Sequence, residues 1–424
     1  MRWMPFAGNY HNPYFDPEIF AKQLPSGKPY DENRWSGTSI DSTSPKGEAF
    51  LRKRFKRIHD WGYRYIKIDG LHFGSPSRCT YGNRSYKSEV FGNAKIYNPD
   101  MTFIEGYHKG MKMLHEEAPD TFMLGCTIAQ NQVSFAPLFG FVDAMRVGPD
   151  NDGAIRGIWS KVTLGADYAG NLWFLNNRVW YNDPDPLYVR ESIPLEKAKW
   201  MASWLAVSGV LNTTSMQYSH LKPERLDIIK RTLPAHCYHA RPVDVLENKH
   251  PAIWQVENQR MLVIGLFNWS EKKATTITHS FERLGLDPKK KYEAFDYWEN
   301  RYLGTLQNQL SEKLPAVGCR VLALREARPY PQLLSTSRHI TQGLIDVKTE
   351  TWNSKTKTLV GTSKVVANDP YKMRIICPQG FTATTIKTSD KMATVSKITQ
   401  QSNGLVCVTI IPSKTETLKW KVIF

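Results

Sequence analysis

The sequence predicts an α/β amino-terminal half followed by antiparallel β-sandwich domains. Before Pro234, short β-like runs such as 65–68 and 139–147 alternate with segments whose apolar residues recur at helical spacing. After Pro234 this spacing disappears, and short β-like runs separated by Gly, Asn and Pro take its place. The chain has 424 residues, 41% of them hydrophobic and 12% aromatic, so it can bury more than one core. Two or three domains are therefore expected.

The clearest helix of the amino-terminal half begins at Pro45. Leu51, Phe55 and Ile58 recur at helical spacing, and Ser44 and Pro45 are placed as the N-cap and a first-turn residue. The later elements expected before the change of pattern are a helix at 195–210, a strand at 209–212 and a helix at 221–233 that Pro234 ends.

Short β-like runs dominate the rest of the chain, with a spacing typical of antiparallel sandwiches. A first group of runs lies at 252–256, 261–268, 274–278, 292–296 and 319–324. A second group, in a segment richer in Thr and Lys, lies at 359–366, 373–377, 406–411 and 418–423. A scaffold role is expected for both groups, and sugar binding by the second would involve Trp352 or Trp420. The expected domains are 1–240, 241–327 and 328–424.

Two segments place a basic residue shortly before a carboxylate at the end of a β-like run. In Tyr65-Ile66-Lys67-Ile68-Asp69-Gly70, Lys67 and Asp69 share one face of the strand because strand side chains alternate. In Arg146-Val147-Gly148-Pro149-Asp150 the same parity joins Arg146 and Asp150. The strand ends of a (β/α)8 barrel carry its active site, and charged side chains buried there are expensive unless they are used. We therefore expect Asp69 and Asp150 to be two acids of one site.

A pair of carboxyl groups suits the cleavage of a glycosidic bond. One group attacks or stabilises the anomeric carbon, and the other protonates the leaving oxygen. Lys67 would keep Asp69 ionised, whereas a less solvated acid can hold its proton at neutral pH. Arg146 would favour the charged form of Asp150, so it is expected to contact substrate or to reach the other acid as well. In the purely structural alternative, Lys67 and Asp69 form an ion pair and Asp150 is a turn residue.

The order of several motifs resembles that of the melibiase-type α-galactosidases and the related α-N-acetylgalactosaminidases. The segments that carry the resemblance are Trp3-Met4-Pro5-Phe6, Ile40-Asp41-Ser42-Thr43-Ser44-Pro45, Trp61-Gly62-Tyr63-Arg64-Tyr65-Ile66-Lys67-Ile68-Asp69, Gly125-Cys126, Val142-Asp143-Ala144-Met145-Arg146-Val147-Gly148-Pro149-Asp150 and Trp180-Tyr181-Asn182-Asp183-Pro184-Asp185, followed by Arg190. They correspond to the third strand of the family's barrel, the start of a helix, and the fourth to seventh strands. The resemblance covers about 190 residues in the family's order.

By this resemblance, Asp69 is the nucleophile and Asp150 the general acid/base of a double displacement that retains anomeric configuration. Four further residues would line the subsite of the cleaved sugar, with the last as an aromatic wall: Lys67, Cys126, Arg146 and Trp3. Cys126 has the alternative of being a small buried hydrophobe. The acids of 182–185 either touch sugar or tie down a loop, and they are left outside the catalytic set.

The resemblance implies a partial (β/α)8 TIM barrel followed by antiparallel β-sandwich domains. Only the third to eighth barrel strands find a counterpart, so the family's amino-terminal β-sandwich and first two strands are missing. We expect a fragment of a longer gene product, with completion by another chain as the alternative. An open barrel leaves two unpaired strand edges, so a fragment that is unstable or inactive in isolation is one expectation.

The resemblance predicts a hydrolase for terminal α-galactosyl residues of oligosaccharides or glycans. One alternative is an α-N-acetylgalactosaminidase or another α-glycosidase of the same clan, and a second is a catalytically silent sugar-binding relative. The choice between an α-galactosidase and an α-N-acetylgalactosaminidase depends partly on the loop Thr127-Ile128-Ala129-Gln130-Asn131. This loop lacks the small and proline residues expected of plain galactosidases.

The net charge of +16 raises the different hypothesis of a polyanion-binding protein. The densest basic run, 51–57, falls on the outer face of the first helix, and no nucleic-acid module accompanies it, so no nucleic-acid partner is expected.

Six cysteines without a Cys-x-x-Cys pair predict mostly free thiols and no zinc module. Neither a metal nor a cofactor is required by the chemistry. No signal peptide and no run of eighteen apolar residues occurs, so no membrane partner is expected. The sequence does not determine the compartment, and a periplasmic or secreted protein is one of the alternatives. It does not determine the oligomeric state either.

Overall fold

The computed structural model describes residues 1–424 apart from 24–26, 28–37, 76–93 and 127–135. Five further residues are described by their backbone alone: Arg2, Trp3, Gln23, His72 and Ala136. The chain divides into two compact units. The first contains Met1–Asn151 and Phe174–Asp185, and the second contains Asp152–Trp173 and Pro186–Phe424. The domain limits expected from the sequence stay a prediction.

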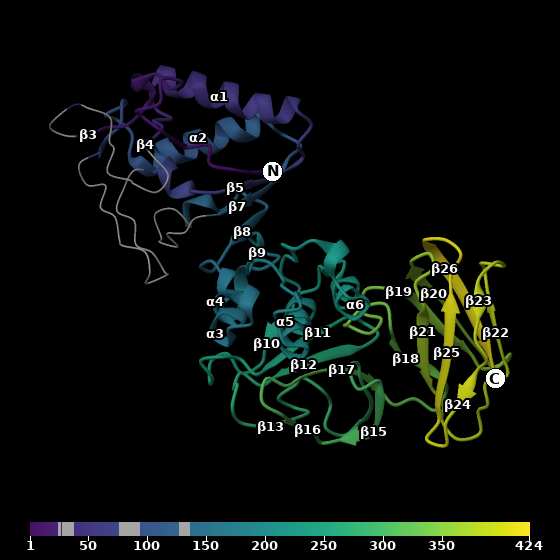
Figure 1. The fold of residues 1–424 in the computed structure, drawn as a ribbon. Coiled ribbons are helices and arrows are strands. Elements are labelled where there is room, and N and C mark those ends of the chain that lie inside the picture. The colour runs from purple at the N-terminus through teal and green to yellow at the C-terminus, as the bar shows by residue number, and fades with distance from the viewer. Residues whose placement is uncertain (24–26, 28–37, 76–93, 127–135) are drawn as a thin grey trace. The chain divides into compact units, whose positions relative to one another are not determined.

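The first unit is built on a five-stranded parallel sheet in the order β1-β5-β7-β8-β9 (Figure 1). Its strands are β1 (Arg2–Trp3), β5 (Tyr65–Ile68), β7 (Phe122–Gly125), β8 (Ala144–Arg146) and β9 (Tyr181–Asp183). Each neighbouring pair is parallel. Parallel strands present their carboxyl ends at one edge, so this sheet brings the residues that follow each strand together.

Two amphipathic helices complete the parallel unit, α1 (Pro45–Asp60) and α2 (Phe103–Glu117). The predicted cap of α1 is confirmed, because Ser44 Oγ accepts a hydrogen bond from the Gly47 N–H at 2.9 Å. The basic residues Lys53, Lys56 and Arg57 are exposed, as expected for the outer face of the helix. Shorter elements are β2 (Ala7–Gly8), β3 (Lys22–Gln23), β4 (Thr38–Ser39), β6 (Ala94–Lys95) and the 3₁₀ turns Pro17–Ile19, Leu71–Gly74 and Ala136–Leu138.

The second unit contains four α-helices within the described residues. They are α3 (Trp159–Val162), α4 (Leu164–Asn171), α5 (Leu195–Ser208) and α6 (Pro223–Thr232), with 3₁₀ turns at Asp152–Arg156 and Tyr218–His220. A further turn, Trp173–Leu175, lies at the boundary with the first unit. The expectations for the last two helices are confirmed within a few residues.

The predicted strand at 209–212 is wrong. Gly209 ends α5 in the left-handed conformation, with φ of 66°, and Val210 to Thr213 belong to no strand. The nearest β-type pairing is an isolated parallel bridge between Leu187 and Thr214. The apolar run is instead the turn that follows a helix buried on most of its surface.

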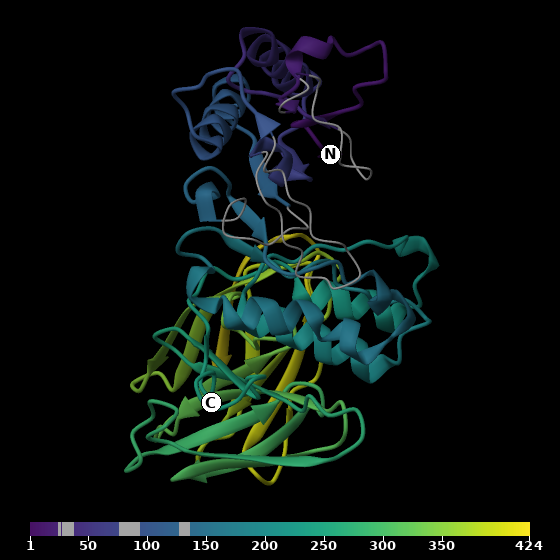
Figure 2. The same ribbon diagram turned by 90° about the vertical axis from the view of Figure 1, so that its left-hand side faces the viewer.

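The first sandwich pairs a six-stranded antiparallel sheet, in the order β10-β11-β12-β17-β14-β15, with the two-stranded sheet β13-β16. Its strands are β10 (Arg241–Pro242), β11 (Ile253–Glu257), β12 (Leu262–Phe267), β13 (Thr275–Ser280), β14 (Lys291–Asp296), β15 (Arg301–Gln307), β16 (Gln309–Leu314) and β17 (Cys319–Glu326). Helix α5 lies across one face of the larger sheet (Figure 2). Trp204 of α5 packs edge-on against Trp254 of β11 at 5.7 Å between ring centroids.

The last part of the chain is a second antiparallel sandwich, as predicted. One sheet has the order β18-β21-β25-β23, with β24 also on β25, and the other has the order β19-β20-β26-β22. The strands are β18 (Gln332–Thr336), β19 (Val347–Asn353), β20 (Thr358–Val365), β21 (Tyr371–Ile376), β22 (Thr385–Thr388), β23 (Thr394–Val395), β24 (Thr399–Gln400), β25 (Leu405–Ile411) and β26 (Glu416–Ile423). Trp420 is a core residue whose Nε1 donates to Ser363 Oγ, whereas Trp352 is only half-buried.

Candidate active site

Titratable side chains gather at the carboxyl edge of the parallel sheet. Asp69 directly follows β5 and Cys126 directly follows the neighbouring β7, and the Cys126 N–H donates to the Ile68 carbonyl at 2.7 Å. On the other side of the sheet, Arg146 of β8 is the register partner of Asp183 of β9. Four strands of different sequence position thus contribute side chains to one edge.

Asp69 is more buried than Asp150, the other predicted acid, because only 1% of its surface is exposed. Its Oδ1 accepts a hydrogen bond from the Gly70 N–H at 2.9 Å, and Gly70 adopts a positive φ of 63° directly after the strand. Burial, followed by the charge of Asp69, raises the pKa of the Cys126 thiol well above its usual range, although Arg146 and Lys67 act in the opposite direction. Cys126 is therefore a neutral thiol beside a carboxylate.

Arg146 is the electrostatic centre of the edge, because it binds two acids at once. Its Nη2 lies 2.7 Å from Oδ1 of Asp150, and its Nη1 lies 2.8 Å from Oδ1 of Asp185. Burial works to lower the pKa of Arg146, but Cys126, Asp185, Asp183 and Asp150 together raise it above its usual value. The guanidinium stays charged, and the second acid that it binds is Asp185.

Asp150 occupies a different environment from Asp69. Its side chain is 41% exposed, and Arg146 holds one of its two carboxylate oxygens. The structure thus places one predicted acid in the protein interior and the other at the solvent boundary. Two acids in unlike surroundings are the arrangement that allows a division of roles between nucleophile and proton donor.

Asp185 is the acid that the sequence interpretation left outside the catalytic set. Only 9% of its side chain is exposed, and its Oδ2 accepts a hydrogen bond from the Asn151 N–H at 2.8 Å. Burial raises its pKa to about 6, against the lowering effects of Arg146 and the Asn151 N–H. The strand parity that singled out Asp69 and Asp150 also joins Tyr181, Asp183 and Asp185, so a signal for this residue was present in the sequence.

The remaining predicted site residues are placed only in part. Lys67 is half-buried on β5, and its charge acts on the pKa of both Cys126 and Asp185. Trp3 pairs through its backbone with Ile68, but its side chain lies outside the described residues. The loop 127–131, on which sugar selection was expected to depend, also lies outside them.

In the part of the chain that the structure describes, no group of three or more His, Cys, Asp or Glu side chains is arranged to hold a metal ion. No described helix has the length and apolar character needed to cross a membrane. Four described cysteines are free thiols: Cys126, Cys319, Cys377 and Cys407.

Comparison with known proteins agrees with this architecture. Residues 252–324 match the family model of the alpha galactosidase C-terminal beta sandwich domain. The GH27 β-L-arabinopyranosidase of Geobacillus stearothermophilus is 13% identical, with a TM-score of 0.54 over 73% of this chain and 68% of that one. The isomalto-dextranase of Arthrobacter globiformis T6, solved with panose, is 13% identical, with a TM-score of 0.55 over 99% of this chain and 81% of that one.

The fold is therefore that of barrel glycosidases with carboxyl-terminal sandwiches, present here as a partial (β/α)8 barrel followed by antiparallel β-sandwich domains. The carboxyl-terminal sandwich at 252–324 is of the α-galactosidase type. The match of this sandwich confirms the resemblance to melibiase-type α-galactosidases that the motifs indicated.

Proposed function

We propose that this chain carries the catalytic acids of a retaining glycoside hydrolase that removes terminal α-galactosyl residues from a carbohydrate substrate. The observation that carries the proposal is the contrast between two acids at one sheet edge. Asp69 is buried behind β5, whereas Asp150 is partly exposed and bound to Arg146. The α-galactosidase-type sandwich supports the choice of sugar.

The reaction proceeds in two displacements. In the first, an Asp69 oxygen attacks the anomeric carbon while Asp150 gives its proton to the leaving glycosidic oxygen, which forms a covalent glycosyl-enzyme. In the second, Asp150 takes a proton from water, the water oxygen attacks the same carbon, and Asp69 leaves as a carboxylate. Retention requires carboxyl groups about 5–5.5 Å apart.

The surroundings of the two acids suit these roles. Asp69 directly follows β5, the strand that carries Lys67, and a hydrogen bond from the Gly70 N–H to its Oδ1 orients the carboxyl group. Asp150 has 41% of its side chain exposed, so a substrate can reach its carboxyl group. Arg146 orients Asp150, and Asp185 orients Arg146 in turn.

The test uses a nitrophenyl α-galactoside and the Asp69→Asn variant. We expect the wild-type chain to release nitrophenol and Asp69→Asn to be at least about a thousandfold slower, since the covalent step is lost. An exposed acid of the same unit, Asp120, gives the matched control Asp120→Asn, which should keep its rate. Treatment with a 2-fluoro galactosyl fluoride should also leave a covalently bound sugar on the peptide that contains Asp69.

Two results would contradict the proposal. One is an Asp69→Asn variant as fast as the wild type, and the other is a wild-type chain that cleaves none of the α-glycosides offered. The Asp150→Asn variant adds a check on the second role. It should lose more rate on an oligosaccharide than on the nitrophenyl glycoside, because nitrophenolate leaves without a proton.

A second candidate is another α-glycosidase activity of the same clan, which includes α-N-acetylgalactosaminidase activity. The isomalto-dextranase covers 99% of this chain, the last sandwich included, and this coverage favours giving an α-glucoside a place in the assay. The rates on nitrophenyl α-galactoside, its N-acetyl analogue, a β-L-arabinopyranoside and panose should be compared side by side. The highest kcat/KM on the galactoside supports the first proposal, and the highest on another sugar supports the second.

A further inference from the structure

We propose a second saccharide-binding site between the two β-sandwiches, in a hollow of about 830 Å³. Its wall from the first sandwich contains Arg260, in the turn between β11 and β12, and Arg325 of β17. Its wall from the second contains Trp352 of β19, with Tyr330 in the segment that joins the sandwiches. The hollow lies wholly in the second unit of the chain, whereas Asp69 and Asp150 belong to the first. The inference goes beyond the proposed function and does not depend on it.

Two aromatic rings that line the hollow are stacked near each other. The rings of Tyr330 and Trp352 are parallel to within 4°, with centroids 6.0 Å apart, and both side chains are half-buried. Phe381 and Phe424 meet the Trp352 ring edge-on, at 5.4 and 5.7 Å, which fixes its plane. The C–H face of a pyranose packs on such a ring, so Trp352 and Tyr330 provide the apolar half of a sugar site.

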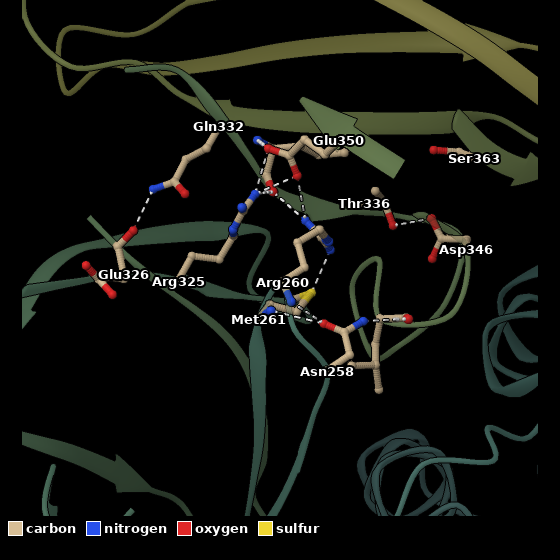
Figure 3. Close-up of polar contacts among 12 residues, drawn as sticks. Asn258, Arg260, Met261, Arg325, Glu326, Gln332, Thr336, Asp346, Glu350 and Ser363 are labelled. Carbon is tan, nitrogen blue, oxygen red and sulfur yellow. Dashed lines mark hydrogen bonds and ion pairs between the residues drawn. The ribbon is translucent and has the colours of Figure 1, made fainter. Parts of the chain in front are cut away.

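The polar half comes from two arginines that converge on one carboxylate (Figure 3). Arg325 Nη1 lies 2.8 and 2.7 Å from the two oxygens of Glu350, and Arg260 Nη1 lies 3.3 Å from one of them. Both Nη1 atoms also donate to the Leu333 carbonyl at 2.7 Å. Burial opposes the charge of Glu350, but the two arginines lower its pKa below the usual value, so the carboxylate stays ionised.

The two guanidinium groups have more donors than the protein uses. Within the described residues, Arg325 Nη2 makes no hydrogen bond, and Arg260 Nη2 contacts only the Met261 sulfur, at 2.6 Å. The Nε atoms of both arginines are buried without an acceptor. Glu350 and the Leu333 carbonyl therefore engage only Nη1 of each guanidinium, and the Nη2 groups favour a ligand rich in acceptor oxygens.

A role in joining the sandwiches alone does not account for these features. The contacts of Nη1 with Glu350 and Leu333 already connect the two walls. They do not account for the half-buried pair of stacked rings, or for the Nη2 donors of the two arginines, in the lining of the same hollow. A hollow of about 830 Å³ falls within the roughly 300–1,000 Å³ range of ligand pockets, which accommodates an oligosaccharide. The ligand class is an oligosaccharide of pyranose units, whose ring face meets Trp352 and whose oxygens accept from the arginines.

Hydrogen–deuterium exchange on the intact chain tests this site locally, without relying on turnover. The probes are stachyose and panose as neutral oligosaccharides, and trigalacturonate as an acidic one. We expect at least one probe to slow amide exchange at 257–262 and 347–353, and the one that acts at the lowest concentration identifies neutral or acidic sugar. The highest probe concentration is about 10 mM, roughly the weak end of specific binding. If none of the three probes slows amide exchange in these segments at that concentration, the proposal is overturned.

Two ring variants tie the effect to the aromatic wall. Trp352→Ala should weaken binding of the active probe about tenfold or more, because a ring face is lost, whereas Trp352→Phe should stay within about threefold. Tyr330→Ala is the second variant and should weaken binding in the same direction if Trp352→Ala fails to fold. Hydrolysis of a nitrophenyl glycoside should be unchanged in all three. Equal affinity in wild type, Trp352→Ala and Tyr330→Ala would sink the inference, whatever the outcome for Asp69.

Discussion

Arg146 and Asp185 form a buried ion pair, with Nη1 of the first 2.8 Å from Oδ1 of the second. The same guanidinium holds Asp150 through Nη2. One buried cation therefore connects an acid that is 41% exposed with an acid that the protein encloses. The ionisation of Asp185 is thereby coupled to the position of Arg146, and through Arg146 to the proposed general acid.

The free energy of unfolding should fall as pH rises, because Asp185 ionises. Its pKa is raised from the usual 3.8 to about 6, so the folded state holds the proton more tightly than the unfolded state does. The stability that the protonated form contributes is complete below about pH 4 and is lost as pH rises from 4 to 6, with a magnitude of up to about 3 kcal/mol. Asp185→Asn cannot ionise, so its urea midpoint should change less than that of the wild type between pH 4.5 and 7.

Asp120 provides the control of opposite sign. It is an exposed acid whose pKa is lowered by His59 and Arg64, so its contribution is present at high pH and lost on acidification. Asp120→Asn should leave the change between pH 4.5 and 7 nearly as in the wild type, because exposed ion pairs are weak. A pH profile of Asp185→Asn that superimposes on that of the wild type would show that Asp185 does not ionise in this range.

Arg146→Lys should cost both stability and activity. An ammonium group cannot bind Asp150 and Asp185 through two separate nitrogens, so either the buried acid or the proposed general acid loses its partner. We expect a loss of about 3–5 kcal/mol in the free energy of unfolding, as for other broken buried pairs, and kcat/KM about a hundredfold lower. Arg52→Lys, at a more exposed cluster with Glu48 and Glu116, should change stability by less than about 1 kcal/mol. Equal losses in the two variants would contradict the special role of Arg146.

Alternation along strands indicated most residues of the candidate site. It found Lys67, Asp69, Arg146 and Asp150 because each lies in or just after a short strand with apolar neighbours on the other face. It would also have found Asp185, but the Asn-Asp-Pro-Asp sequence suits a loop equally well, and only burial distinguishes the two. The pair of Arg146 with Asp150 is local in sequence, whereas its pair with Asp185 depends on the register of β8 and β9, which no local pattern encodes.

The prediction of elements failed where the local pattern contradicts the tertiary environment. The strands β15 and β16 were missed because β15 has no fully buried residue and β16 has only two, so the apolar alternation that marks a half-buried strand is weak in them. The run at 209–212 contains the apolar residues Val210 and Leu211, yet it forms no strand, and Gly209 adopts a left-handed conformation at the end of α5. Capped helices such as α1 were predicted well, since their signals lie within a few residues of each other.

Asp369→Asn should destabilise the second unit more than Asp227→Asn, although both acids bind Arg231. Asp369 makes a two-pronged pair, with both nitrogen–oxygen distances at 2.7 Å, and it is largely buried. Asp227 is on the exposed side of the same guanidinium. We expect a loss of about 1–3 kcal/mol for Asp369→Asn and less than about 1 kcal/mol for Asp227→Asn in urea titrations. The reverse order would show that the connection between α6 and the last sandwich does not depend on this pair.

Gly209→Ala should be among the most harmful small substitutions in the second unit. Gly209 has a φ of 66°, and a Cβ placed there would lie 2.3 Å from the ring of His236, whose Nε2 is hydrogen-bonded to the Val207 carbonyl at 3.0 Å. Backbone strain and the clash act together, so we expect a loss of more than about 2 kcal/mol. Gly380→Ala is the matched control, since φ is also positive at 90° but nothing lies within 4 Å of the new Cβ. That variant should lose only about 1 kcal/mol, and thermal melts in which the two variants lose equal stability would rule out the contact with His236 as the cause.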